Sequence, residues 1–252
     1  METAWPDSSG APSPRAEVRV ARDRDELEAA FRLVYRLYRQ REYSRPHPAC
    51  LRYVWHLGLP GSCTIISETS EQLIGTMSCI PDGPFGLPMD SNFGPELKAL
   101  RASGKRIAEA MSLAIDAPAG IPVWQVFFGL TRFLVQYAIW HGADELAIAV
   151  HPNHTPFYCR HLGFTAFGSC RPYQWAEGHP ATACRLDLGQ VARSQAVRPS
   201  LLRMYLDDPV SEGQFQHPDM SPADHRYFCR KMQWDPASAP ELVSASRLRR
   251  PA

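Results

Sequence analysis

A long apolar run, IPVWQVFFGLTRFLVQYAIW at 121–140, constrains the fold of this chain more than any other feature. Its length would suit a transmembrane helix. However, the run contains two glutamines and an arginine, Pro122 stands where a first helical turn tolerates proline, and Gly142 stands where helices commonly end. Strand-like runs flank it at 105–116 and 145–150. We therefore predict a buried core helix rather than a membrane span, within a right-handed βαβ crossover that joins parallel strands.

Charge and cysteine content exclude several classes of protein. The 27 basic and 26 acidic residues leave a net charge of +1, so there is no overall positive field for nucleic acid. The seven cysteines show no paired spacing, and the first residues lack a signal-peptide pattern. We expect free thiols in a reducing cytoplasm and no nucleic-acid partner.

The length of 252 residues favours one hydrophobic core with an appendage. Residues 1–16 are rich in Pro, Ser and Ala and are predicted to form a disordered leader, followed by a core over 17–189. A polar, Pro-punctuated helical extension over 190–240 is predicted to pack on this core, with a helix capped by Ser221. Residues 241–252 are expected to be a frayed tail.

Secondary structure at the start of the core follows from local patterns. Residues 17–21 predict a short strand, and Asp23 with Glu26 forms a candidate capping box for the helix that follows. Further β-rich runs lie at 63–68, 72–80, 164–170 and 181–188. The first two of these runs suggest a hairpin, and the last two are candidates for pairing with each other.

A glutamate interrupts the apolar face of the predicted strand at 105–116. Strict alternation would place Glu109 on the same face as four apolar side chains: Ile107, Met111, Leu113 and Ile115. Burial raises the pKa of a carboxyl and suits it to accept a proton near neutral pH. Glu109 is therefore a candidate catalytic base; the alternative is a glutamate that only makes structural hydrogen bonds.

The stretch HPNHTPFYCRHLGF at 151–164 concentrates groups that bind metals. Its candidate ligands are His151, His154, Cys159 and His161. Their spacing matches no recurring zinc pattern, and residues 159 and 161 would face different sides of a helix. Cys159 also lacks a recognisable nucleophile motif. We predict no metal site here and interpret the segment as a strand end, a loop and a helix.

Three arginines share one face of the predicted first helix: Arg32, Arg36 and Arg39. A row of charges on a helix is commonly a solvated surface, and a docking patch for an acidic partner is the alternative. The pattern by itself leaves both interpretations open.

The order of elements resembles the GNAT-type acyltransferase fold, an α/β (α+β) architecture with a mixed, twisted central sheet flanked by helices. More narrowly, it resembles the N-acyl amino acid synthases, which are related to the acyl-homoserine-lactone synthases. RIAEAMSLAID, HPNHTPFYCRHLGF and the following RPY at 171–173 carry the resemblance, which extends from about 17 to 188. It implies an acyltransferase that uses an acyl-phosphopantetheine thioester as co-substrate and holds no tightly bound cofactor.

Common acetyl-CoA users of this fold grip pyrophosphate with a glycine-rich loop before the long helix. This chain has DAPAGIPVWQV at 116–126, where Pro118 and Pro122 lack N–H donors. We therefore expect an acyl carrier protein, rather than coenzyme A, as the donor. Since carrier proteins are acidic, we assign the three arginines Arg32, Arg36 and Arg39 to binding of the carrier and its phosphopantetheine arm.

The resemblance implies transfer of a fatty acyl group to the amine of an amino acid or a similar small amine. Glu109 would be the base, and Tyr158 is a candidate acid for the leaving thiolate, with structural packing as its alternative role. Ser112 stands where the homoserine-lactone synthases carry an arginine, which disfavours S-adenosylmethionine as acceptor. The alternatives are an acetyl-CoA-dependent N-acetyltransferase and a catalytically silent acyl-binding protein.

Overall fold

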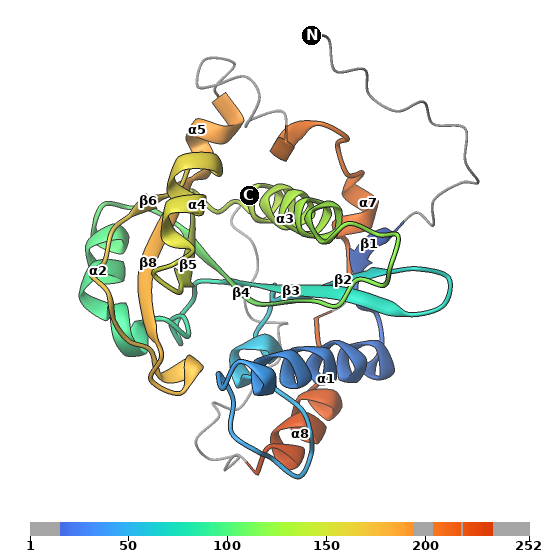
Figure 1. Ribbon diagram of the computed structural model, residues 1–252. Coiled ribbons are helices and arrows are strands. Elements are labelled where there is room, and N and C mark those ends of the chain that lie inside the picture. The colour runs from blue at the N-terminus through green and yellow to red at the C-terminus, as the bar shows by residue number, and fades with distance from the viewer. Residues whose placement is uncertain (1–15, 194–203, 218, 234–252) are drawn as a thin grey trace, which may run out of the picture.

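The computed structural model describes residues 16–193, 204–217 and 219–233. One mixed sheet runs in the order β1-β2-β3-β4-β5-β8-β6, and β7 pairs with β8 off this path (Figure 1). The strands are β1 (Glu17–Val20), β2 (Cys63–Glu68), β3 (Leu73–Pro81), β4 (Ile107–Ile115), β5 (Glu145–Val150), β6 (Thr165–Ala166), β7 (Arg171–Pro172) and β8 (Pro180–Asp187). The helices are α1 (Arg24–Gln40), α2 (Asp90–Ala102), α3 (Val123–Trp140), α4 (Thr155–His161), α5 (Leu188–Arg193), α7 (Glu212–Phe215) and α8 (Pro222–Lys231), with short 3₁₀ turns η1 (Trp55–Gly58) and η2 (Gln174–Ala176). All but one residue of the predicted leader and all of the predicted frayed tail lie outside the described residues.

The pairing of the strands confirms the main expectations about the sheet. β2 and β3 form the predicted antiparallel hairpin, and β4 lies parallel to β5 with α3 connecting them. β8 pairs antiparallel with β5 on one side and with β6 on the other. β4 and β5 are the only parallel pair among the described strands. Their C-terminal ends therefore lie next to each other and point in the same direction.

The apolar run predicted as a core helix is α3, which begins at Val123 because Pro122 keeps an extended backbone and acts as its N-cap. Its inner face, including Leu130 and Leu134, is fully buried against the sheet. In Figure 1 α3 covers one face of the sheet and α1 the other. In the described parts of the chain, no helix combines the length and the apolar character needed to cross a bilayer.

Helix α1 starts at the predicted cap, although only half of the capping box forms. Asp23 accepts the backbone N–H of Glu26 at 2.9 Å. In a capping box the Glu26 carboxylate would accept the backbone N–H of Asp23. Here it accepts the N–H of Arg22 instead, and it also pairs with Arg19 at 2.7 Å. The salt bridge to β1 thus takes the side chain that a capping box would use, and it joins α1 to the sheet.

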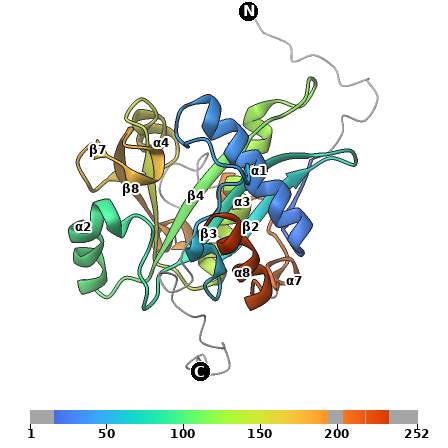
Figure 2. The ribbon, with the colours of Figure 1, turned by 90° about the horizontal axis from the view of Figure 1, so that it is seen from below.

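The C-terminal helix α8 lies beside α1, far from it in sequence (Figure 2). Ser221 caps α8 as predicted by accepting the N–H of Asp224 at 3.1 Å. Phe228 is buried with its ring centroid 5.0 Å from that of Phe31 on α1. Glu28 on α1 binds the hydroxyl of Tyr227 at 2.6 Å, so α1 and α8 form one layer under the sheet.

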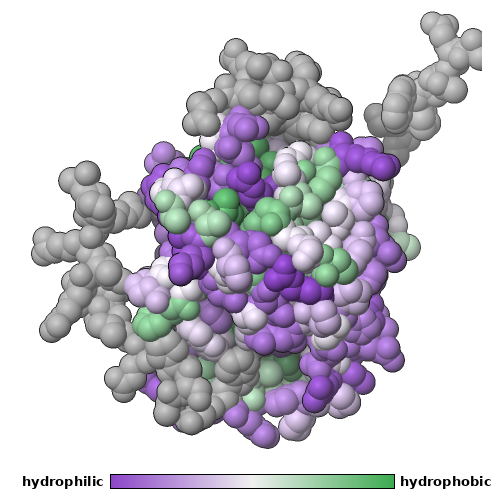
Figure 3. Space-filling view, turned by 90° about the vertical axis from the view of Figure 1, so that its left-hand side faces the viewer, coloured by the Kyte–Doolittle hydropathy of each residue, from purple (hydrophilic) through white to green (hydrophobic). Residues whose placement is uncertain are grey.

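The side of the molecule that carries α2 and β6 is largely hydrophilic, with apolar groups in separate patches (Figure 3). Several large apolar side chains remain exposed in the described ranges: Phe85, Val123, Trp124, Phe157 and Leu206. Exposed apolar side chains of this kind are ordinary on protein surfaces.

Candidate active site

The parallel strands β4 and β5 separate halfway along their length. They pair from Ile107 with Glu145 to Glu109 with Ala147, and beyond this register they no longer pair with each other although both continue. Two adjoining cavities open at this point. We call them the Glu109 cavity and the Tyr158 cavity, after one lining residue of each, and five residues line both: Tyr38, Ala110, Met111, Ser112 and Ala149.

A β-bulge at Ser112 corrects the predicted alternation of β4. Ser78 pairs with Met111 whereas Thr76 pairs with Ala114, so β4 contains an extra residue against β3. Ser112 adopts a left-handed backbone with φ 58°, which is unusual for a residue other than glycine. The bulge reverses the facing of the strand, so Ile107 and Met111 pack on the α1 side while Leu113 and Ile115 pack on the α3 side. The single apolar face expected from the sequence was wrong beyond residue 111.

Glu109 is buried with 1% of its surface exposed, on the α1 side of the sheet. One carboxylate oxygen accepts the backbone N–H of Met89 at 2.9 Å, and the other accepts the hydroxyl of Tyr173 at 3.4 Å. Loss of hydration raises the pKa of Glu109 from 4.5 to about 8, and the charges of Asp90 and Asp82 act in the same direction. The two hydrogen bonds only partly oppose this rise. The carboxyl group therefore exchanges a proton close to neutral pH beside an open cavity.

Tyr158 lies on α4 and lines the second cavity, which is otherwise mostly apolar. Its ring packs edge-on against Phe164 with centroids 5.5 Å apart. Burial raises the pKa of the Tyr158 hydroxyl to about 12, so it stays protonated and able to donate. Glu109 and Tyr158 thus border neighbouring cavities that share the Ser112 bulge.

The three arginines of α1 predicted to bind the carrier, Arg32, Arg36 and Arg39, are bound to other groups of the protein. Arg32 pairs with Glu28 at 2.6 Å and Arg36 pairs with Asp116 at 2.7 Å. Arg39 donates to the backbone carbonyl of Ser44 at 2.6 Å. None of the three lines the Glu109 cavity or the Tyr158 cavity; Arg32 and Arg36 are exposed, and Arg39 is half-buried. They remain candidates for contact with a partner protein, not for contact with the reacting group.

The rings of His151 and His154 lie near each other, with centroids 6.3 Å apart, and His161 packs against Phe157. His151 lines the Glu109 cavity, and His154 is the N-cap residue of α4. In the residues that the structure describes, no three His, Cys, Asp or Glu side chains come together as possible metal ligands.

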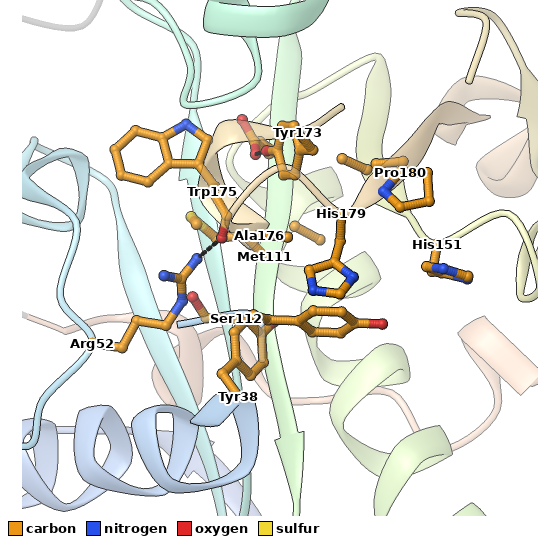
Figure 4. Close-up of a pocket in the computed structure, with 15 residues that line it drawn as sticks. Tyr38, Arg52, Met111, Ser112, His151, Tyr173, Trp175, Ala176, His179 and Pro180 are labelled. Carbon is orange, nitrogen blue, oxygen red and sulfur yellow. Dashed lines mark hydrogen bonds between the residues drawn. The ribbon is translucent and has the colours of Figure 1, made fainter. Parts of the chain in front are cut away.

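Several residues of the Glu109 cavity carry little local signal in the sequence. Tyr173 belongs to the RPY motif that carried the resemblance, but nothing local predicted its bond to Glu109. Arg52 comes from an irregular segment and Trp175 from η2, far apart in the chain, and the guanidinium of Arg52 donates to the backbone carbonyl of Trp175 (Figure 4). The only sequence signal for Arg52 was a charged residue within the mainly apolar segment LRYVWHLG.

The sequence matches the family described as N-acyl amino acid synthase FeeM over residues 29–187. Among solved structures, FeeM, an N-acyl amino acid synthase from uncultured soil microbes, is 31% identical, and the match covers 72% of this chain and 97% of FeeM with a TM-score of 0.63. The acyl-homoserine-lactone synthase LasI is 17% identical over 71% of this chain and 93% of its own, with a TM-score of 0.54. BjaI, a CoA-dependent acyl-homoserine lactone synthase solved with S-adenosylmethionine and isopentyl-CoA, is 14% identical over 84% and 98%, with a TM-score of 0.55. No curated protein sequence matches significantly. These similarities confirm the predicted GNAT-type acyltransferase fold.

Proposed function

Because the chain belongs to the FeeM family of N-acyl amino acid synthases and is an acyltransferase, we propose that it transfers a fatty acyl group from the phosphopantetheine thioester of an acyl carrier protein to the amine of an amino acid or similar small amine. The observation that carries this proposal is the buried Glu109 carboxyl, with a pKa of about 8, where β4 and β5 separate.

An amine attacks a thioester only after its ammonium form has lost a proton. In the proposed reaction the Glu109 carboxylate accepts this proton, directly or through one water molecule. The nitrogen then forms a bond to the thioester carbonyl carbon, and the carbonyl electrons move to oxygen. A pKa near 8 suits this role because the carboxylate form is accessible at neutral pH and is a much stronger base than an exposed carboxylate.

We place the thioester carbonyl at the Ser112 bulge, where the two cavities meet. There, backbone N–H groups released from regular pairing would stabilise the tetrahedral oxyanion. Collapse of the intermediate breaks the carbon–sulfur bond and releases the pantetheine thiolate, which takes a proton from the Tyr158 hydroxyl. The second proton leaves the nitrogen as the neutral amide forms and reprotonates the Tyr158 phenolate, while Glu109 passes the first proton to solvent. The apolar lining of the Tyr158 cavity, including Met77 and Phe164, suits the first part of a fatty acyl chain.

The connection between β4 and α3 supports a carrier-protein donor. Pro118 and Pro122 have no N–H, and the N–H of Ile121 is bound by the carbonyl of Pro118 at 3.2 Å. The start of α3 therefore offers few free donors for a nucleotide pyrophosphate. The exposed side chains of Arg32 and Arg36 would contact the acidic carrier, with Arg39 beside them. All seven cysteines are free, as suits the cytoplasm, where we place the reaction.

Mass spectrometry tests this function. The purified protein is incubated with the twenty proteinogenic amino acids and either a long-chain acyl carrier protein or the matching acyl-CoA. The expected result is a new N-acyl amino acid that forms faster from the carrier-bound donor. Glu109→Gln should form little product, whereas the matched exposed control Glu71→Gln should be as active as the wild type. Equal activity of Glu109→Gln would remove this residue from the mechanism, and the absence of any N-acyl amino acid would refute the proposed function.

A further inference from the structure

Arg52 is a half-buried cation on the wall of the Glu109 cavity. It lies in the irregular segment between α1 and η1, and its guanidinium sits over the ring of Tyr38 at 4.8 Å from the centroid. One terminal nitrogen donates to the backbone carbonyl of Trp175, as Figure 4 shows. Tyr38 and Trp175 therefore hold the guanidinium in one orientation at the cavity.

No carboxylate neutralises Arg52 among the residues that the structure describes. Its Nε is buried and has no hydrogen-bond partner. Glu177 is the acidic residue whose charge acts on Arg52, and that carboxylate is itself paired with Arg45 at 2.6 Å. A partly buried charge whose buried Nε–H donor has no partner is costly to maintain in a folded protein. Burial accordingly lowers the pKa of Arg52 from its usual range. A cation that lines the cavity without a salt bridge is suited to bind an anion there.

We propose that Arg52 binds the α-carboxylate of the acceptor and thereby selects free α-amino acids over amines that lack this group. This inference rests on the proposed function. A guanidinium offers parallel N–H donors that match the two oxygens of a carboxylate. Glu109 lines the same cavity, so an amino acid held by Arg52 carries its amine within the space that the base also borders. Because Tyr38 and Trp175 already fix the guanidinium, little ordering remains to be done on binding.

The test compares acids with neutral analogues that differ only at the carboxylate. The probes are the N-decanoyl derivatives of L-alanine, L-leucine and L-phenylalanine, each as free acid and as primary amide, with dissociation constants measured by calorimetry on the full chain. The wild type should bind the acids at least about tenfold more tightly than the amides. In Arg52→Gln this preference should fall to near one while affinity for the amides is kept. Arg52→Lys keeps the positive charge but loses the paired N–H donors of the guanidinium, so its preference for the acids should be intermediate.

The exposed Arg226→Gln on α8 is the matched control and should retain the full preference. Circular dichroism and melting temperature show whether Arg52→Gln is folded; if it is not, Arg52→Lys alone carries the comparison. A wild-type preference near one, no binding of any acid, or an unchanged preference in folded Arg52→Gln would each overturn the inference.

The other anion available in the proposed reaction is the phosphate of the pantetheine arm. S-decanoyl pantetheine with and without its 4′-phosphate distinguishes this source. Arg52→Gln should bind both forms as the wild type does, and a selective loss for the phosphorylated form would assign Arg52 to the donor and overturn the inference. These binding readouts need no turnover, so failure of the acyl transfer itself is recognised separately.

Discussion

Replacing Glu109 with glutamine should stabilise the protein at alkaline pH, although it removes a proposed catalytic group. Glutamine has nearly the shape of a protonated glutamate. Its carbonyl can accept the N–H of Met89, and its amide can donate to the oxygen of Tyr173, so both present partners are retained. At pH 4, where the carboxyl is mainly protonated in the folded and the unfolded chain, the variant and the wild type should therefore have nearly equal stability.

The difference grows with pH because the folded state holds the Glu109 proton more tightly than the unfolded state. The unfolded carboxyl loses its proton around pH 4.5 and the folded one around pH 8. Between these values the unfolded wild type binds fewer protons, so its free energy of unfolding falls as the pH rises. At about 1.4 kcal/mol per pH unit, the interval corresponds to about 5 kcal/mol by pH 8. Glutamine does not titrate, so Glu109→Gln should avoid this loss.

Urea denaturation of the full chain at pH 4, 6, 8 and 9 measures the effect. For a slope of about 2.5 kcal/mol per molar urea, the unfolding midpoint of Glu109→Gln should exceed that of the wild type by roughly 2 M at pH 8 and should match it at pH 4. The exposed Glu71→Gln should follow the wild type at every pH. Parallel curves for wild type and Glu109→Gln would show that the carboxyl has no raised pKa and would refute the reasoning about its role as a base.

Three further outcomes follow from the geometry. Tyr173→Phe removes a hydrogen bond that lowers the pKa of Glu109, so the pH profile of turnover should move to higher pH; an unchanged profile would separate Tyr173 from the base. Charge reversal of Arg32 and Arg36 should reduce kcat/KM for acyl carrier protein about tenfold at low salt but leave acyl-pantetheine unaffected, and equal losses would contradict carrier docking. Tyr158→Phe should lower kcat by about 10²-fold if its hydroxyl protonates the thiolate, whereas unchanged kcat would leave it only a packing role.

Local pattern was sufficient for the elements that surround the reaction centre. The apolar period of 121–140 and the flanking β-rich runs predicted a helix between parallel strands. An element buried on one face has apolar residues at a regular spacing, and that spacing can be read in the sequence. Glu109 was recognisable as a carboxylate in an apolar setting for the same reason. The order of these elements also sufficed for the family resemblance, which the comparisons confirmed.

The reversal of facing within β4 was not predictable from alternation. It depends on the left-handed backbone of Ser112 and on the register against β3, and a serine carries no local signal for either. Alternation therefore placed Leu113 and Ile115 beside Glu109, whereas the bulge sends them to the opposite face of the sheet.

The sequence by itself determined the helix between two parallel strands and the buried carboxyl on one of them, since both depend on neighbours within a few residues. Only the tertiary structure decided how that carboxyl is held and what faces it. Tyr173 reaches Glu109 across 64 residues, and Arg52 reaches the carbonyl of Trp175 across 123. How much hydration Glu109 loses, and whether the charge of Arg52 is paired, depend on all the segments that enclose the cavity. The spacing of residues along the chain does not reveal that arrangement.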